Sequence, residues 1–241
     1  MDNENNWENF WQEWRNNEVK QEEDLYFQVG LTVNKKPIDK EAFDLINKSI
    51  VDGLALNKED ILVEFCCGNG LTTFELKDKV KQIIATDFAA HLINTAKQFK
   101  SAPNITYNLG NVFEFLENFN DNWQVHPNKY LMNNSLAYFT PQELENIFTN
   151  IIRIAGDGFV FLVRGVPNDL LKWNFYNTEE RKLKYFENQK TGSTNDGLGR
   201  WWAPDEIKDI CNKLNLKCDI RDQPAQISNY RMDIVITGKK S

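Results

Sequence analysis

The chain has 241 residues, 41% of them hydrophobic and seven of them tryptophan, which is enough to bury a large core in a single domain. The net charge of −7 repels phosphate backbones and disfavours a nucleic-acid partner. No stretch of about 18 consecutive apolar residues is present, and the acidic N-terminus lacks the basic start and apolar run of a signal peptide. We therefore expect no membrane span and a cytoplasmic location.

The cysteines and histidines do not have the spacing of a zinc site. Cys66 and Cys67 are adjacent at the end of a predicted strand, Cys211 and Cys218 lie far downstream, and the chain has two histidines. Reduced, structural thiols and no bound metal are the expectation.

The first fifty residues carry an aromatic stripe and a helix start. Four aromatic residues recur at spacings of three and four between Trp7 and Trp14, which predicts a short helix within residues 4–20. The stripe is either a packing face or a dimer surface, so both a monomer and a homodimer remain open. Asp39, just after Pro37-Ile38, has the position of a helix N-cap.

From residue 57 onward, short apolar segments alternate with helical ones. This alternation predicts an α/β fold with a mostly parallel, Rossmann-like sheet covered by helices on both faces. Only ten residues separate the last two strands, so these should form an antiparallel hairpin at one end of the sheet. We expect strands at 61–66, 82–86, 105–108, 130–132, 159–163, 216–221 and 232–237, and helices at 71–79, 89–99, 112–116, 141–155 (with Thr140 as N-cap) and 204–214.

Residues 164–203 interrupt this alternation. The segment is rich in Trp, Tyr, Phe, Lys and Arg, and it is too long for a tight connection. Long insertions after the strands of an open α/β sheet usually build the substrate side of a site. We interpret the segment as a partly helical cap.

A glycine turn follows the first strand of the predicted sheet. The sequence Ile61-Leu62-Val63-Glu64-Phe65-Cys66-Cys67-Gly68-Asn69-Gly70 ends a strand, turns sharply and opens a helix. Such a turn brings backbone N–H groups close to a ligand without a side chain in the way. A dinucleotide pyrophosphate would need the spacing G-x-G-x-x-G, which is missing here.

At this turn the chain resembles the class I S-adenosylmethionine (SAM)-dependent methyltransferases, whose first motif has the pattern acidic-x-G-x-G-x-G. Glu64 stands at the acidic position, Gly68 and Gly70 at the second and third glycines, and Cys66 replaces the first glycine. The resemblance extends over about residues 57–238. It implies that Glu64 orients the ammonium group of SAM, that the glycines accommodate its methionine and ribose portions, and that S-adenosylhomocysteine (SAH) is the product.

Residues after the next strands extend the resemblance. Asp87 follows the second strand, where an acidic residue of the family accepts both ribose hydroxyls, and Phe88 corresponds to a residue that packs on adenine. Gly110-Asn111-Val112 resembles the family's Gly-Asp-Ala stretch, so the Asn111 carbonyl oxygen is expected to face the adenine amino group. Asn133, at the end of the fourth strand, is also expected among the cofactor residues.

The N-terminal segment is where the family commonly places a lid over SAM. Gln28 and Thr32 are candidates to hold the cofactor carboxylate, and Tyr26 and His91 are weak candidates for a catalytic base. No residue is an unambiguous base. The order of a Trp-rich helix, Gln-Val-Gly-x-Thr-x-Asn and Lys36-Pro37-Ile38 is also similar to methyltransferases of bacterial surface-polysaccharide (capsule) clusters.

Side chains at the ends of the cap are the substrate candidates. Arg164 and Arg200 would suit a phosphate or carboxylate on the acceptor, and Tyr138, Trp201 and Trp202 could stack on a sugar or surround an alkylammonium. Core packing or a solvated surface is the alternative for each. The Asn-Pro-Pro-aromatic motif of nucleic-acid amino-group methyltransferases is missing after the fourth strand.

The sequence thus predicts one methyltransferase domain over residues 1–241, with a lid (1–50), a SAM-binding core (57–163), a substrate cap (164–203) and a C-terminal helix and hairpin (204–241). The expected reaction is methylation of an amine or hydroxyl on a small, phosphorylated or sugar-type metabolite. The alternatives are a protein or nucleic-acid methyltransferase and an inactive SAM-binding regulatory domain.

Overall fold

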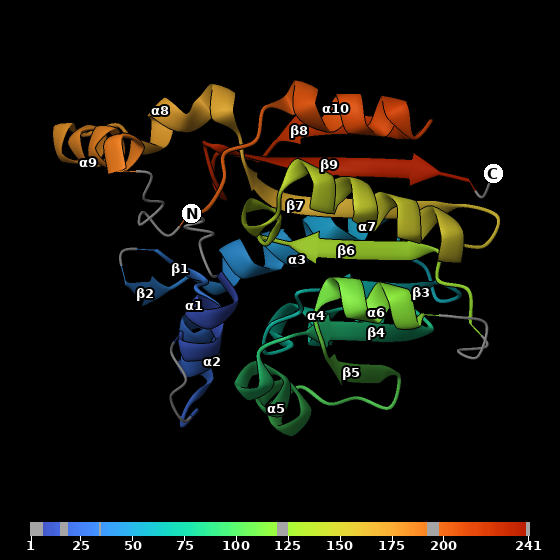
Figure 1. Ribbon diagram of the computed structural model, residues 1–241. Helices are drawn as coiled ribbons and strands as arrows, with labels where there is room; N and C mark the ends of the chain where they lie inside the picture. The colour runs from blue at the N-terminus through green and yellow to red at the C-terminus, as the bar shows by residue number, and fades with distance from the viewer. Residues whose placement is uncertain (1–6, 15–18, 34, 120–124, 192–197, 240–241) are drawn as a thin grey trace.

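A seven-stranded sheet runs through the middle of the molecule (Figure 1) in the order β5-β4-β3-β6-β7-β9-β8. The computed structural model describes residues 7–14, 19–33, 35–119, 125–191 and 198–239. The strands are β3 (Ile61–Phe65), β4 (Gln82–Asp87), β5 (Ile105–Leu109), β6 (Lys129–Asn133), β7 (Phe159–Pro167), β8 (Lys217–Asp222) and β9 (Arg231–Gly238).

The first five strands of this sheet are parallel, and β9 pairs antiparallel with both β7 and β8. The sequence-based expectation of a mostly parallel sheet closed by an antiparallel hairpin is therefore confirmed. The chain leaves β3 towards β4 and later returns to place β6 on the other side of β3. At such a reversal of strand order, the carboxyl ends of the strands leave a crevice where α/β proteins bind ligands.

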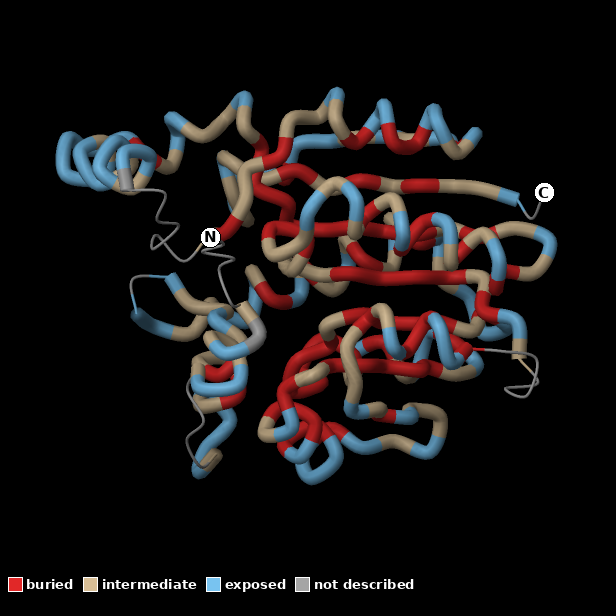
Figure 2. The backbone as a smooth tube through the Cα atoms, viewed as in Figure 1, coloured by how far each residue is buried: buried red, intermediate tan, exposed pale blue. Residues whose placement is uncertain are grey.

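Helices cover both faces of the sheet. One buried cluster joins the strands to α6 (Val112–Asn118), α7 (Pro141–Ile154) and α10 (Pro204–Lys213), and a second joins them to α3 (Lys40–Leu54) and α5 (Ala90–Phe99). Figure 2 shows the buried strands between helices whose outer sides are exposed. The inner strands β3, β4 and β6 are buried on both sides because both faces of the sheet are covered there.

Two helix starts are set by the N-caps that the sequence predicts. The Asp39 carboxylate accepts a hydrogen bond from the Ala42 backbone N–H at 2.8 Å, and Thr140 Oγ1 accepts one from the Glu143 N–H at 3.2 Å. The helix α4 (Leu71–Glu75) is shorter than expected, because the chain passes into turns after residue 75.

The N-terminal part contains more structure than the sequence predicts. The aromatic stripe forms α1 (Trp7–Glu13), and residues 4–6 and 15–18 of the expected helix lie outside the described residues. A second helix, α2 (Glu22–Gln28), and a small hairpin of β1 (Thr32–Val33) and β2 (Lys36–Pro37) were not expected. The Asp24 carboxylate accepts from the Lys20 and Gln21 backbone N–H groups, which fixes the start of α2.

The segment after β7 forms η3 (Asp169–Leu171), α8 (Lys172–Phe175) and α9 (Glu179–Thr191). The strand β7 continues to Pro167, four residues beyond the expected end, with a shift of its pairing to β9 between Val163 and Val166. Figure 1 shows α9 at the outer end of this segment, away from the sheet. Among the described residues, no helix is long and apolar enough to cross a membrane.

Candidate active site

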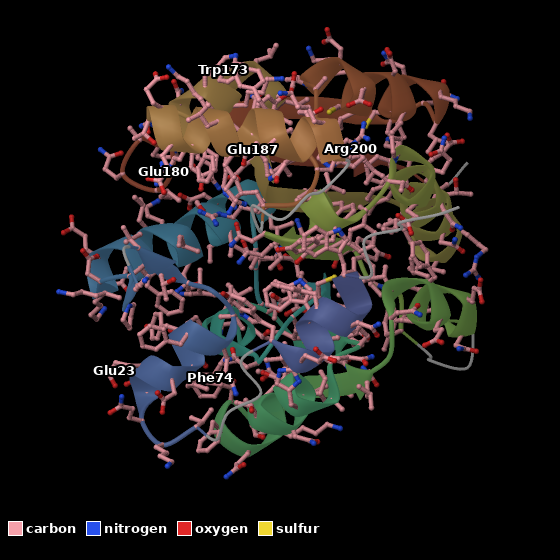
Figure 3. All side chains as sticks on the ribbon, turned by 60° about the vertical axis from the view of Figure 1, so that its left-hand side comes forward. Glu23, Phe74, Trp173, Glu180, Glu187 and Arg200 are labelled. Atoms are coloured by element: carbon pink, nitrogen blue, oxygen red, sulfur yellow. The ribbon has the colours of Figure 1, made fainter. Side chains whose placement is uncertain are left out.

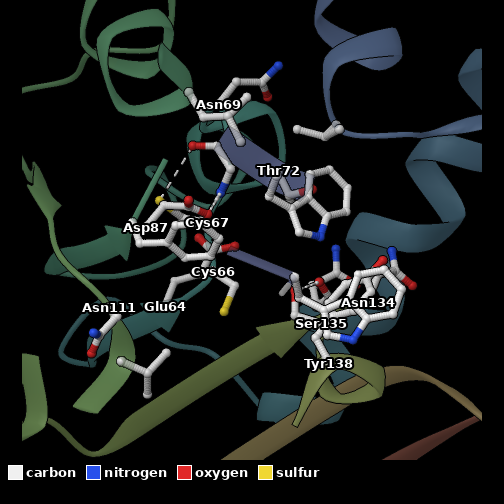
Figure 4. Close-up of a pocket in the computed structure, with 18 of the residues that line it drawn as sticks. Glu64, Cys66, Cys67, Asn69, Thr72, Asp87, Asn111, Asn134, Ser135 and Tyr138 are labelled. Atoms are coloured by element: carbon white, nitrogen blue, oxygen red, sulfur yellow. Dashed lines mark hydrogen bonds between the residues drawn. The ribbon is translucent and has the colours of Figure 1, made fainter. Parts of the chain in front are cut away.

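A pocket of about 490 Å³ lies at the carboxyl ends of β3, β4 and β6. Its walls come from the turn after β3, the segments that follow the next strands, the 3-10 helix η2 (Leu136–Tyr138), and α1 together with the segment after α2. Figure 4 shows Glu64, Cys66, Asp87 and Asn111 on one side of this pocket and Ser135 with Tyr138 on the other. The volume is in the range of small-molecule and cofactor sites, about 300–1,000 Å³.

The turn after β3 needs left-handed backbone at three positions. Cys66, Gly68 and Gly70 have φ angles of 55°, 58° and 73°. A Cβ on Gly68 would lie 2.8 Å from Val29 Cγ1, and one on Gly70 would lie 2.4 Å from the Tyr107 hydroxyl oxygen. Cys66 holds a conformation that favours glycine, at the position where the motif has glycine. Cys66 and Gly68 line the pocket, whereas Gly70 begins α4 behind it.

Glu64 presents a buried carboxylate to the pocket. Its side chain is 2% exposed, and within the described part of the chain Oε2 has no hydrogen-bond partner. Burial, together with the nearby negative charge of Asp87, raises the pKa of Glu64 to about 7, although the nearby Thr73 side chain acts in the opposite direction. A buried acceptor without a partner is destabilising. A cationic ligand group in the pocket would provide the missing partner.

Asp87 is held in place by the backbone on either side of it. Its Oδ2 accepts from the Gly68 N–H and its Oδ1 from the Ala89 N–H, both at 2.9 Å. Burial raises the pKa of Asp87, and the same N–H groups act in the opposite direction. Each oxygen keeps a second lone pair, so the carboxylate can accept two ligand hydroxyls while its orientation is fixed.

The adjacent wall consists of Phe88, Asn111 and Val112, all expected from the sequence. Asn111 is also the N-cap of α6, and its side-chain oxygen accepts from the Glu114 N–H at 2.9 Å. The second lone pair of that oxygen and the amide N–H groups are what Asn111 can offer a ligand.

Asn133 lines the pocket and is held by the buried side chain of Arg164. Arg164 Nη1 donates to Asn133 Oδ1 at 3.2 Å, Nε donates to Ser49 Oγ at 2.9 Å, and Asp233 forms an ion pair at 3.7 Å. Arg164 is 1% exposed and does not line the pocket. It connects β7 to α3, β6 and β9 and supports Asn133 from behind.

The other cap residues expected at the substrate also lie outside the lining. Trp202 is completely buried, and its indole N–H donates to the Leu136 carbonyl oxygen at 3.1 Å, so it packs in the core. Arg200 pairs with Glu206 at 2.5 Å. Trp201 packs in an aromatic cluster with neighbours that include Phe175. Of the five substrate candidates, Tyr138 alone lines this pocket.

The N-terminal helix supplies two pocket residues that the sequence reasoning did not assign to the site. Trp7 and Trp11 of α1 line the pocket, and their rings lie 4.6 Å and 5.7 Å from the ring of Tyr138. Their spacing of four places both on one face of the helix. The spacing predicts that this face of the helix is buried, but it does not predict which part of the protein the face packs against.

The lid residues that line the pocket are the sequence neighbours of the two expected to contact the cofactor. Val29 and Leu31 line the pocket, whereas Gln28 and Thr32 do not. Gln28 is buried instead, and its Oε1 accepts from Asn69 Nδ2 at 3.1 Å. This bond joins α2 to the turn after β3.

The two weak candidates for a base do not line the pocket. Tyr26 packs its ring 5.3 Å from that of Phe43, and burial raises the pKa of its hydroxyl. His91 is near the start of α5, and burial lowers the pKa of its imidazole. Within the described ranges, no three His, Cys, Asp or Glu side chains are grouped as metal ligands.

A comparison with protein families matches residues 62–158 to a model described as a methyltransferase domain. No curated protein matches the chain in sequence. Three solved structures share the fold at low sequence identity. Magnesium protoporphyrin IX methyltransferase from Synechocystis PCC 6803 with bound SAH has a TM-score of 0.57 and 12% identity, over 100% of both chains.

The plantazolicin methyltransferase BamL, in complex with a desmethyl analogue of plantazolicin and SAH, has a TM-score of 0.55 and 11% identity over 83% of this chain and 85% of its own. DhpI in complex with SAH has a TM-score of 0.53 and 12% identity over 81% and 85%. Residues 62–158 thus match a methyltransferase domain, and the chain shares the Rossmann-like fold of these three structures.

Proposed function

We propose that the pocket binds SAM and that the protein transfers its methyl group to a small-molecule acceptor. The observation that carries this proposal is the pair of buried carboxylates at the pocket. Glu64 has an oxygen without a partner, and Asp87 is oriented by two backbone N–H groups. One fits an ammonium group and the other fits a pair of ribose hydroxyls, and SAM carries both.

The remaining pocket residues fit the rest of the cofactor. Phe88 and Val112 give an apolar surface for adenine, with Asn111 at its edge. Gly68 leaves the backbone of the turn accessible, because its Cα carries no side chain. When bound, SAM supplies a methyl group activated by a positively charged sulfur.

The protein contributes mainly alignment and exclusion of water. Trp7, Trp11, Val29 and Leu31 close the pocket from the N-terminal side, and this arrangement supports a lid. A methyl transfer needs the acceptor, the methyl carbon and the sulfur in line, and a dry site favours that geometry.

A phosphorylated or sugar-type acceptor and a role in surface-polysaccharide synthesis came from the sequence, with Arg164 and Arg200 as the anion partners. Both arginines lie outside the pocket lining, so the pocket adds no support to an anionic acceptor. The capsule role, the cytoplasmic location and the oligomeric state stay predictions from the sequence.

Calorimetry with SAH tests the cofactor assignment, and NAD serves as the competing cofactor. We expect saturable SAH binding and no NAD binding, because the turn lacks the spacing for a pyrophosphate. Binding of NAD in place of SAH would contradict the proposal. Binding of SAH without turnover of any acceptor would favour the inactive regulatory domain.

A further inference from the structure

An aromatic wall of Trp7, Trp11 and Tyr138 stands across the pocket from the buried carboxylates. The Tyr138 ring packs against the rings of Trp7 and Trp11, with centroid distances of 4.6 Å and 5.7 Å, and Phe139 also lines the pocket. Figure 4 places Tyr138 and Ser135 on the opposite side of Cys66 from Asp87 and Asn111. If SAM occupies the side with Glu64 and Asp87, the acceptor contacts this wall. The inference therefore rests on the proposed function.

The charged side chains that line the pocket are all acidic. Glu64, Asp87 and Glu143 are the charged side chains of the described lining, which contains no Lys, Arg or His. Arg231 acts on Tyr138 electrostatically, but it does not line the pocket. Acidic groups repel an anionic acceptor, whereas aromatic faces and carboxylates both attract a cation.

The wall also lacks a group suited to remove a proton from an alcohol. Burial raises the pKa of the Tyr138 hydroxyl, so Tyr138 does not ionise readily. Glu143 is held at the start of α7, where its Oε2 accepts from the Thr140 N–H at 2.6 Å. An amine needs no such base, because its neutral form already has a nucleophilic lone pair.

We propose that the methyl acceptor is an uncharged or cationic amine that carries an apolar ring, and that the wall of Trp7, Trp11 and Tyr138 binds the ring. In the reaction, an acceptor bound as the ammonium first releases one proton to water, and the lone pair of the neutral amine then forms the new N–C bond while the bond from the methyl carbon to sulfur breaks. That electron pair stays on sulfur and gives the neutral thioether of SAH. The methylated ammonium then releases one proton to water.

Calorimetry on the SAH-loaded protein tests this assignment with three probes. 2-Phenylethylamine has the ring and the amine, phenylalanine adds one carboxylate, and phosphoethanolamine replaces the ring by a phosphate. We expect 2-phenylethylamine to bind at least about tenfold more tightly than either anionic probe. Equal or tighter binding of phenylalanine or phosphoethanolamine, or no saturable binding of 2-phenylethylamine, would overturn the proposal.

Two variants separate the wall from other aromatic surfaces. We expect Tyr138→Leu and Trp11→Leu each to weaken 2-phenylethylamine binding by about three- to thirtyfold, since a cation over an aromatic ring contributes about 0.5–2 kcal/mol. Trp11 lies on α1, outside the sheet core, so its substitution does not endanger folding. Trp173→Leu is the control, because Trp173 is 47% exposed and Figure 3 shows it at the outer edge of the cap.

The measurements also distinguish this proposal from the one it rests on. SAH affinity is determined first for each protein. Loss of SAH binding by the wild type would remove the proposed function. Normal SAH binding with unchanged amine affinity in both wall variants would overturn the acceptor assignment alone.

Discussion

Glu64 links the ionisation of the pocket to the stability of the protein. Its pKa is raised from 4.5 to about 7 by burial, so the folded state prefers the protonated acid. The stabilising effect of that acid is complete below about pH 4.5 and is lost as the pH rises through 7. At pH 8 the buried anion costs about 3 kcal/mol, at 1.36 kcal/mol for each pKa unit.

Glu64→Gln should therefore be more stable than the wild type at pH 8, with the difference disappearing below pH 4.5. Chemical denaturation of the cofactor-free protein at both pH values measures it. A stability difference that does not change with pH would contradict the raised pKa of Glu64.

The affinity for SAH should depend on the same ionisation. An ammonium group binds the ionised carboxylate, and the α-amino group stays mostly protonated below about pH 7.7. We expect the Kd of the wild type to fall about five- to tenfold between pH 6 and 7.5. Glu64→Gln should bind more weakly at pH 7.5 and show a flat profile over this range, which calorimetry can check.

Asp87 gives the sharpest test of the ribose position. Asp87→Ala removes both oxygens that would accept the ribose hydroxyls, and we expect at least a hundredfold loss of SAH affinity by calorimetry. Asp157, in the turn after α7, is not among the pocket residues, so Asp157→Ala is the matched control. Unchanged affinity of Asp87→Ala would refute the role.

Three cofactor candidates from the sequence line the pocket and share one property. Glu64, Asp87 and Asn111 lie in or directly after strands of a parallel sheet, so their position follows once the strands are placed. Arg164 and Trp202 could not be placed this way, because the directions of side chains late in β7 and beyond it depend on packing against α3 and η2. The lengths of the segments and the spacing of residues in the sequence do not predict that packing.

Among the secondary-structure elements, α1 is the best suited to a deletion that tests the lid. Trp7 and Trp11 line the pocket, and both rings pack against Tyr138. A variant that lacks residues 1–14 should keep α2, whose Leu25 carbonyl oxygen and Gln28 side chain bind Asn69. We expect it to fold and to release SAH at least tenfold faster in stopped-flow measurements. An unchanged release rate would exclude α1 as part of a lid.

The strands were easier to predict than the N-terminal elements. Most strands of the sheet are short apolar segments bounded by turn residues, and the position of each was predicted to within one or two residues, β7 excepted. The short helix α2 buries Leu25 and Gln28, so its sequence shows little periodicity. The hairpin of β1 and β2 has two residues per strand, which is too short for any pattern to predict.

Arg164 connects several elements of the molecule through hydrogen bonds and an ion pair. The guanidinium joins Ser49 of α3 and Asn133 of β6 to its own strand, and it pairs with Asp233 of β9. The Asp233 carboxylate in turn accepts from the Gly165 N–H at 2.9 Å and from Gln223 Nε2 at 2.7 Å. The network therefore crosses the junction between the parallel strands and the closing hairpin.

Arg164→Ala should destabilise the protein by about 3–5 kcal/mol, because it leaves Asp233 without its cationic partner in a mostly buried place. For a domain of this length, that corresponds to a melting temperature lower by about 6–20 °C. Arg200→Ala is the matched control: its partner Glu206 is partly exposed, and such pairs contribute at most about 1 kcal/mol. Thermal denaturation followed by circular dichroism compares the two. Equal melting temperatures would show that the junction does not depend on Arg164, and that its guanidinium is available for another role.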